Sequence, residues 1–184
     1  MKSVLREIAI TLAIALVLFL GIQYSLQNAE VISGSMLPTL GIGERLFINK
    51  LAYKFGHLPQ RGDIIVFVPP PQVNSDKDYI KRIIGLPGEV VEIAGGNVFI
   101  HKTDSTVIKL DEPYIAATPD YTYTSPTIAP DNYFVLGDNR NSSGDSHASG
   151  GWTVPRSNIV GRAWWVTWPF SKFGAAPNYK LSGA

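Results

Sequence analysis

The chain has 184 residues, enough for one domain with a sizeable hydrophobic core, and its net charge of +1 gives no indication of a nucleic-acid partner. It contains no cysteine, which excludes disulfides, thiolate metal sites and a cysteine nucleophile. Its histidines, His57, His101 and His147, are too far apart in sequence to form a ligand motif, so we expect neither a metal nor another cofactor.

The first segment of the chain predicts a membrane anchor. Basic residues precede an uncharged run, which as a helix from Ile8 to Leu26 would span roughly 28 Å, about one hydrocarbon core. Because the cations precede the run and no basic cluster follows it directly, the N-terminus is predicted to be cytoplasmic. We therefore expect residues 1–27 to be a short cytoplasmic tail and a single transmembrane helix, and residues 28–184 to be an extracytoplasmic β-rich domain.

Two other interpretations of this segment are open. A cleavable secretory signal also combines a basic start with an apolar core, but this run is long, and Gln27-Asn28-Ala29 has a poor residue at the outer small-residue position. A buried helix of a soluble protein would show a polar face, which this run lacks. The anchor interpretation places the protein in the cell (plasma) membrane, with a thylakoid-type internal membrane as the alternative.

The stretch V-I-S-G-S-M-L-P-T-L follows the predicted anchor and carries two serines. On an extended backbone Val31, Ser33 and Ser35 would point to the same side. A serine in such a stretch can be a nucleophile only if a base removes its proton. The alternative is an ordinary polar loop that leaves the membrane, so the function depends on whether the rest of the chain supplies a base.

Short strands between turns are predicted over the remaining chain, and its 17 glycines and 13 prolines also suit a mainly β fold. Residues 111–131 lack periodicity and are expected to form a long surface excursion. The triplet Arg61-Gly62-Asp63 precedes a buried strand, so it is interpreted as a turn with a charge pair rather than as an integrin ligand. The predicted strands are 44–50, 64–68, 79–85, 89–93, 98–100, 107–110, 132–136 and 159–168.

The candidate base lies in the strand Y-I-K-R-I-I-G. Lys81 and Arg82 are consecutive, so they face opposite sides of the strand, and one of them faces a covered side. Lys81 has apolar neighbours, and desolvation there would lower its pKa. This matters because a lysine with the ordinary pKa is less than about one part in a thousand neutral at pH 7. The alternative is a lysine that extends to the sheet edge and stays solvated.

Two later segments are also open to two interpretations. The run G-D-N-R-N-S-S-G-D-S-H from Gly137 to His147 is dense in hydrogen-bonding side chains, but would be a mere polar loop on a surface. In the last strand Trp164, Trp165 and Trp168 lie close together. They are either core residues or aromatic residues that touch the bilayer interface.

Four blocks in this order carry a resemblance to a known family. They are S-G-S-M-L-P-T-L, R-G-D-I-I-V-F, Y-I-K-R-I-I-G-L-P-G-E and G-D-N-R-N-S-S-G-D-S. With the anchor they cover nearly the whole chain and resemble the bacterial type I signal peptidases, which are membrane-anchored serine proteases. The resemblance implies an antiparallel β catalytic domain with a Ser/Lys dyad and no cofactor. It also implies that the substrates are signal peptides of exported preproteins, cleaved after small residues in the Ala-X-Ala manner.

The resemblance also implies roles for individual residues. By motif position Ser35 is the nucleophile and Lys81 the general base. The Ser33 hydroxyl and the Ser35 backbone N–H form the oxyanion hole, and Ser143 orients the lysine. The positions that match residues supporting the site are Arg82, Asp138 and Asp145.

An extended substrate beside residues 31–35 would place alternate side chains in shallow apolar pockets. The candidate lining residues of the substrate pockets are Val31, Met36, Leu40 and Ile80.

One departure from the family is visible. An arginine often stands two places after the second acid, where this chain has His147, so an Asp145–arginine salt bridge is not carried over.

Two rival functions make different predictions. A self-cleaving repressor-type peptidase shares the Ser/Lys dyad, but it would carry a DNA-binding domain and no anchor. A membrane-anchored, non-catalytic β domain would keep its full function without Ser35 or Lys81. Under the peptidase interpretation the partners are signal peptides and the lipid bilayer, with no nucleic acid and no metal.

Overall fold

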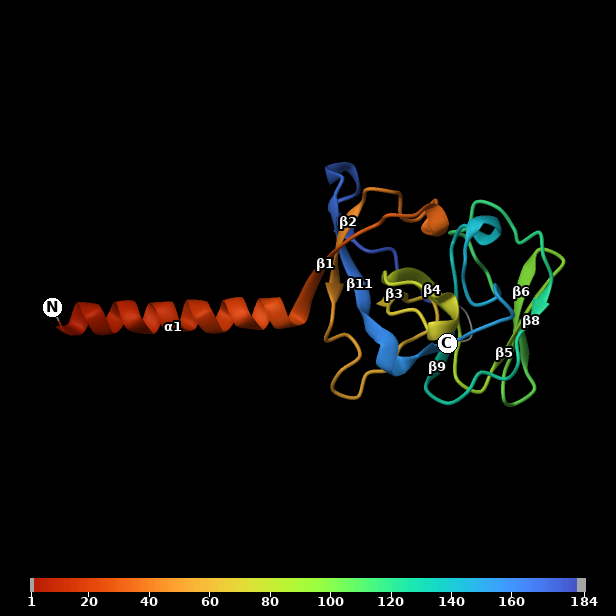
Figure 1. Cartoon of the computed structure of the whole chain (residues 1–184), viewed down its shortest axis with the longest axis horizontal. Coiled ribbons are helices and arrows are strands. Elements are labelled where there is room, and N and C mark those ends of the chain that lie inside the picture. The colour runs from red at the N-terminus through yellow and green to blue at the C-terminus, as the bar shows by residue number, and fades with distance from the viewer. Residues whose placement is uncertain (1, 182–184) are drawn as a thin grey trace.

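The computed structural model describes residues 2–181 and shows a long helix that projects from a β-rich domain (Figure 1). Helix α1 (Lys2–Ser25) is exposed on every side from residue 3 to residue 24. Its 24 residues span roughly 36 Å, enough to cross a hydrocarbon core. By length and composition, Ser3–Ser25 is the single candidate membrane span among the described residues. The helix ends one residue before the predicted Leu26, which begins the first strand.

The larger of two antiparallel sheets has eight strands, in the order β1-β2-β11-β3-β4-β9-β10, with β12 paired to β11. Strand β11 bends through register shifts against β2 and β3, so the sheet curls. Its strands are β1 (Leu26–Glu30), β2 (Arg45–Asn49), β3 (Ile64–Phe67), β4 (Tyr79–Gly85), β9 (Asn132–Leu136), β10 (Val154–Pro155), β11 (Ile159–Trp168) and β12 (Gly174–Ala175).

The smaller sheet lies at the end of the domain far from α1 (Figure 1). Its order is β7-β6-β5-β8, and five short 3₁₀ turns lie in the connections of the domain. The strands are β5 (Val90–Ala94), β6 (Asn97–His101), β7 (Val107–Lys109) and β8 (Tyr123–Thr124). The turns are η1 (Gly34–Met36), η2 (Pro71–Val73), η3 (Arg140–Ser142), η4 (Arg156–Asn158) and η5 (Phe170–Lys172).

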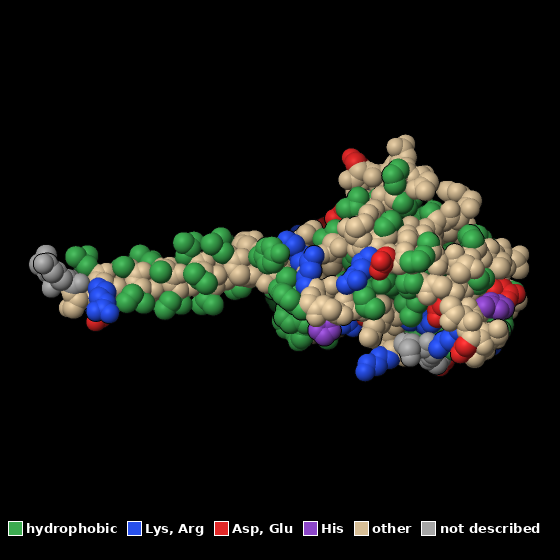
Figure 2. All heavy atoms as spheres, turned by 90° about the horizontal axis from the view of Figure 1, so that it is seen from below, with side chains coloured by type: hydrophobic (Ala, Val, Ile, Leu, Met, Phe, Trp, Pro, Cys, Tyr) green, Lys and Arg blue, Asp and Glu red, His purple; other side chains and the backbone are tan. Residues whose placement is uncertain are grey.

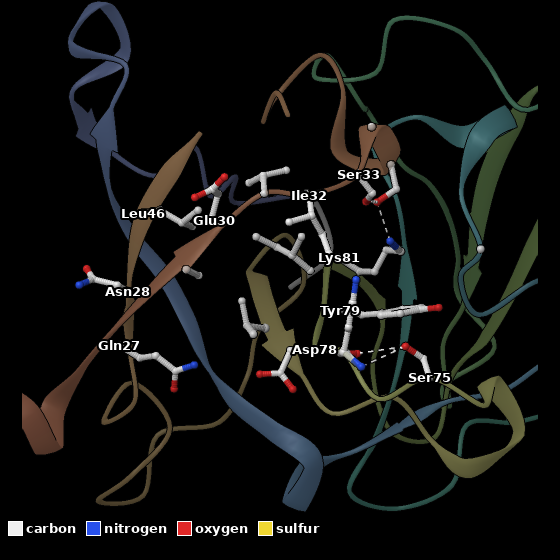
Figure 3. A pocket seen from close by; sticks show the side chains of 18 of the residues that line it. Gln27, Asn28, Glu30, Ile32, Ser33, Leu46, Ser75, Asp78, Tyr79 and Lys81 are labelled. Carbon is white, nitrogen blue, oxygen red and sulfur yellow. Dashed lines mark hydrogen bonds between the residues drawn. The ribbon is translucent and has the colours of Figure 1, made fainter. Parts of the chain in front are cut away.

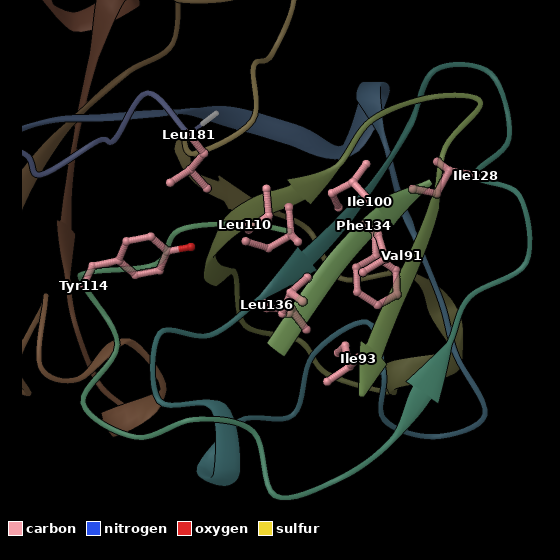
Figure 4. Packing of buried hydrophobic residues seen from close by; sticks show 11 residues of the cluster. Val91, Ile93, Ile100, Leu110, Tyr114, Ile128, Phe134, Leu136 and Leu181 are labelled. Atoms are coloured by element: carbon pink, nitrogen blue, oxygen red, sulfur yellow. The ribbon is translucent and has the colours of Figure 1, made fainter. Parts of the chain in front are cut away.

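The burial of the strands follows their sequence pattern. In β5 and β6 every second side chain is buried, as expected of strands with one covered face, whereas all four residues of β3 are buried. Figure 4 shows one apolar cluster, in which Val91, Ile100 and Phe134 pack between the smaller sheet and β9. A second cluster lies beneath the serine stretch and includes Leu46 and Ile64. The predicted mainly antiparallel β fold is confirmed.

The prediction for residues 111–131 is wrong in part, because the segment is anchored in the core. Tyr114 and Ile128 are buried in the cluster of Figure 4, and the segment contains β8. Glu112 accepts two hydrogen bonds from the buried Arg140, at 2.7 and 2.6 Å. Each contact is made by a single residue rather than by a repeating face, so no periodicity marks them in the sequence.

The Arg61-Gly62-Asp63 triplet is a buried turn and presents no exposed ligand. Arg61 donates to Glu89 at 2.9 and 2.6 Å, and Asp63 pairs with Arg162 at 2.7 Å. Arg61 is 1% exposed and Asp63 is 6% exposed. The two charges of the triplet therefore pair with other segments, and they tie the turn to the body of the domain.

Candidate active site

The serine stretch changes conformation between its two serines. Ser33 has an extended backbone, whereas Ser35 lies within the single 3₁₀ turn η1. The expectation that both serines share one strand face is therefore wrong, because the chain leaves the extended conformation at Gly34. The turn nevertheless brings the two hydroxyls to 3.2 Å from each other.

Asn139 holds the turn that carries Ser35. Its backbone N–H donates to the Ser35 carbonyl oxygen at 3.0 Å, and its side-chain amide donates to the Gly34 carbonyl oxygen at 3.1 Å. Both bonds join segments that are far apart in the sequence, so sequence reasoning missed this residue. The only signal was its position inside the polar run that begins at Gly137.

Lys81 reaches Ser35 from strand β4. Its Nζ donates to the Ser35 Oγ at 2.7 Å, and Figure 3 shows its side chain directed towards the serine turn. Burial lowers the pKa of Lys81 to about 8 from its ordinary 10.5, while the carboxylates of Asp145 and Asp138 oppose this shift. Within residues 2–181 Lys81 forms no ion pair. A buried, unpaired lysine in contact with a serine hydroxyl is suited to act as its base.

Arg82 points to the opposite face of β4, as the strand periodicity predicts. It donates to both oxygens of Asp138, at 2.9 and 2.7 Å, and to the Gly62 carbonyl oxygen at 2.8 Å. Its guanidinium also lies 4.1 Å from the centre of the Tyr114 ring. Both neighbouring cations are thus covered, but only Arg82 has a carboxylate partner.

Ser143 lies next to the serine turn across Gly137. A Cβ atom at Gly137 would overlap both the Ser143 hydroxyl and the Ser35 carbonyl oxygen, so only glycine fits between them. The Ser143 Oγ is buried, and no hydrogen bond joins it to another described residue. A buried hydroxyl without a partner is unusual in a folded protein, so Ser143 is a candidate site residue.

Asp145 contacts both Gly137 and His147. It accepts the Gly137 N–H at 2.8 Å and contacts the Nδ1 of His147 at 2.5 Å. The imidazole stacks on Tyr121 with 4.0 Å between ring centres. His147 therefore occupies the position where an arginine was expected from the family pattern, and it pairs with the same acid.

A groove of about 690 Å³ leads away from the two serines, between β1 and the start of β4. Of the predicted lining residues, Val31 and Ile80 line the groove. Met36 and Leu40 do not, which corrects that prediction: both side chains are fully buried in the cluster beneath the serine stretch, Met36 from within the 3₁₀ turn and Leu40 from the segment after it. Other residues that line the groove are Ala29, Ile32, Leu46, Val66 and Tyr79.

Comparison with known proteins assigns the family. The family model described as "Signal peptidase, peptidase S26" matches residues 2–168. The chain belongs to the S26 signal peptidase family. Members of this family are serine endopeptidases, so the family and enzyme class implied by the four sequence blocks are confirmed.

Relatives in the S26 family match most of the chain. A signal peptidase I of Leptolyngbya laminosa is 43% identical over 178 residues, which cover 94% of this chain and 84% of that protein. Signal peptidase IB of Staphylococcus aureus is 34% identical over 192 residues, 94% of each chain. The crystal structure of a signal peptidase I from Enterococcus faecalis V583 is 33% identical, covers 57% of this chain and 96% of that chain, and has a TM-score of 0.47.

The described part of this S26 domain contains no set of side chains suited to bind a metal ion. Within residues 2–181, no group of three or more His, Cys, Asp or Glu side chains is placed to hold a metal ion. At the end of the groove near η1, the hydroxyls of Ser33 and Ser35 and the amine of Lys81 lie together.

Proposed function

We propose that this chain is a membrane-anchored signal peptidase I that cleaves exported preproteins with a Ser35/Lys81 dyad. The observation that carries the proposal is the 2.7 Å contact between the Lys81 Nζ and the Ser35 Oγ. With a pKa of about 8, roughly one Lys81 in ten is neutral at pH 7, against fewer than about one in a thousand at the ordinary pKa. Burial thus supplies the base that the serine needs.

The reaction proceeds through an acyl-enzyme. Neutral Lys81 takes the proton of Ser35 as its Oγ attacks the scissile carbonyl carbon. The Ser35 N–H and the Ser33 hydroxyl stabilise the oxyanion, and the loss of one such donor typically costs about 3 kcal/mol of transition-state stabilisation. The Lys81 ammonium then protonates the leaving amine, and neutral Lys81 next deprotonates a water that hydrolyses the ester.

Four further residues support the dyad in this proposal. Ser143 orients the Lys81 ammonium once it forms, consistent with its unpaired buried hydroxyl. Arg82 and Asp138 hold β4 against the strand that precedes the polar run. Asp145 fixes Gly137 and, through it, the close approach of Ser143 to the serine turn.

The substrate is a signal peptide with small residues at the last position and at the third-last position before the cut. Strand β1 is an edge of its sheet, and the groove runs along it, so an extended peptide can lie there as an added strand. Val31 and Ile80 would limit the size of the side chains accepted near Ser35. This assignment accounts for a groove that is apolar close to the serines.

The proposal includes a place in the membrane. The anchor ends with α1 at Ser25, and the domain that begins with β1 at Leu26 lies outside the cytoplasm, since the basic residues precede the span. The membrane is the plasma membrane or a thylakoid-type internal membrane. In either one the anchor holds the catalytic domain beside substrates that are themselves inserted in the bilayer.

The test is cleavage of a purified preprotein by the full chain in detergent. Ser35→Ala and Lys81→Ala should be inactive yet folded, whereas Lys102→Ala, in the connection between β6 and β7, should cleave like the wild type. His147→Ala should retain activity, because the imidazole contacts Asp145 rather than Ser35. If His147→Ala were as inactive as Ser35→Ala, a histidine base would replace the dyad. Cleavage by Ser35→Ala would show that the nucleophile lies elsewhere.

A further inference from the structure

A second pocket, of about 620 Å³, lies apart from the groove and shares none of its lining residues. The loop between β2 and β3 forms one wall, and η4 with the segment before β9 forms the other. Three cations line it, Lys50, Lys54 and Arg156, against one carboxylate, Asp131. The pocket is therefore suited to an anion.

The end of α1 fixes the position of this pocket. The Lys50 N–H donates to the Ser25 carbonyl oxygen at 2.8 Å, and the Lys50 Nζ lies 5.9 Å from the centre of the Tyr24 ring. When α1 spans a bilayer, Tyr24 lies at the lipid–water boundary, where tyrosine is common. The pocket then opens at the level of the lipid headgroups. Figure 2 shows cationic side chains gathered where the helix meets the domain.

The tip of the same loop exposes apolar side chains. Phe55 is 88% exposed, the highest value among the exposed large hydrophobic residues of the described chain. Phe55 and Gly56 both have left-handed backbone conformations, with φ of 55° and 87°, and the resulting turn directs the ring outward. Leu58 is exposed as well, at 57%. Apolar tips beside lysines are typical of segments that lie in a membrane interface.

The lysines of the pocket are available to a ligand, whereas the arginine is engaged within the protein. Arg156 donates to the carbonyl oxygens of Tyr53 and His57, each at 3.2 Å, and so holds the loop in place. Lys50 and Lys54 form no ion pair with any residue from 2 to 181. A fixed loop with two unpaired ammonium groups is a preorganised anion site.

We propose that this pocket binds the phosphate of an anionic glycerophospholipid from the bilayer that α1 spans. Lys50 and Lys54 contact the phosphate, and Phe55 enters the acyl region beside it. The inference rests on the proposed membrane anchor. It gives the domain a second attachment, so that the domain no longer pivots on the end of α1 alone.

The test is native mass spectrometry of the full chain in a zwitterionic detergent, with dioleoyl-phosphatidylglycerol or dioleoyl-phosphatidylcholine added. The wild type should retain phosphatidylglycerol preferentially. Lys50→Gln with Lys54→Gln should weaken this binding about tenfold or more. The control, Lys102→Gln with Lys109→Gln, makes the same charge change in β7 and in the connection before it, and should bind like the wild type. Thermal melting of both double variants verifies that they are folded.

Three outcomes would overturn the inference: equal retention of the two lipids, equal weakening in the control, or displacement of phosphatidylglycerol by an equal concentration of inorganic phosphate. Displacement by inorganic phosphate would indicate a site for free anions rather than for a lipid. Phe55→Ser distinguishes a free-anion site from a lipid site, because it weakens lipid binding only if the ring contacts the acyl region. Ser35→Ala measured in parallel should bind lipid like the wild type. Loss of cleavage and loss of lipid binding are therefore read independently.

Discussion

Strand β4 carries two consecutive cations on opposite faces, and their hydrogen-bond partners differ. Arg82 is fully buried but bound to both oxygens of Asp138, whereas Lys81 is buried without an ion pair and contacts the Ser35 hydroxyl. Arg82 has a carboxylate partner, whereas Lys81 has none, and burial lowers the pKa of Lys81 to about 8. In the proposed mechanism the base is therefore the buried cation that lacks a counterion.

Loss of the Lys81 amine has the largest expected effect on activity. Lys81→Met keeps the volume of the side chain but removes the base, so kcat/KM for preprotein cleavage should fall by at least about 10⁴-fold. Progress curves of cleavage by the full chain in detergent measure this. A fall of less than tenfold would show that Lys81 is a structural cation like Arg82.

Loss of the Arg82–Asp138 pair on the other face of β4 should lower the free energy of unfolding rather than act on the cleavage chemistry. Asp138→Asn leaves Arg82 buried without its counterion, which typically costs about 3–5 kcal/mol of folding free energy. Glu30→Gln breaks the exposed Arg45–Glu30 pair and should cost less than about 1 kcal/mol. Thermal or denaturant unfolding compares the two. Equal losses would contradict the structural role of the buried pair.

The unpaired lysine should itself destabilise the fold. Its pKa of about 8 in the folded state lies below its ordinary 10.5, so the cost of the buried charge is fully present below pH 8 and disappears as the pH rises towards 10.5. Lys81→Met should therefore be more stable than the wild type by up to about 3 kcal/mol at pH 7. This difference should shrink above pH 8. A constant difference would mean that the charge is not the cause.

Gly137→Ala tests the close packing behind the dyad. The added methyl group overlaps the Ser35 carbonyl oxygen and the Ser143 hydroxyl, and a displacement of about 1 Å at the nucleophile can lower kcat/KM about 100-fold. Gly144→Ala is the matched control, because nothing lies within 4 Å of a Cβ there. Similar activity in both variants would remove Gly137 from the site.

The pH dependence of cleavage tests the proposed role of Lys81. With neutral Lys81 as the base, kcat/KM should rise about tenfold per pH unit below pH 8 and level off above it. Initial rates between pH 5 and pH 10 at low substrate concentration provide the profile. A profile that levels off already near pH 6 would point to an imidazole base instead.

The smallest effect is expected in the groove. Ile80→Ala should admit a larger residue before the cut and change the preference between two such substrates about tenfold. Met36→Leu, in the core behind the serine turn, should leave the preference unchanged. Competition between two preproteins that differ only at the cleavage site measures the ratio. An unchanged ratio for Ile80→Ala would remove this residue from the pocket.

Strand periodicity predicted the arrangement of β4, because alternation is a local property of the chain. The same reasoning failed over residues 31–35, where extended geometry was assumed and a 3₁₀ turn begins at Gly34. The turn buries Met36, and it is held by bonds from Asn139, about a hundred residues further along the chain. A single sequence does not reveal contacts of this kind.

The burial of residues 111–131 was unpredictable for a related reason. Glu112 and Tyr114 are held by Arg140, so the segment gains its order from a distant partner rather than from a repeating apolar face. The long-range hydrogen bonds, which no local pattern reveals, determine where these residues lie.

Strand β1 begins at the residue that follows the last residue of α1, so no flexible linker separates the membrane span from the sheet. Ser35 follows Ser25 by a stretch that, fully extended, reaches at most about 35 Å. Under the proposed function, this short connection limits how far Ser35 can lie from the bilayer. It would therefore also limit the distance between a cleavage site and the membrane-embedded part of its substrate.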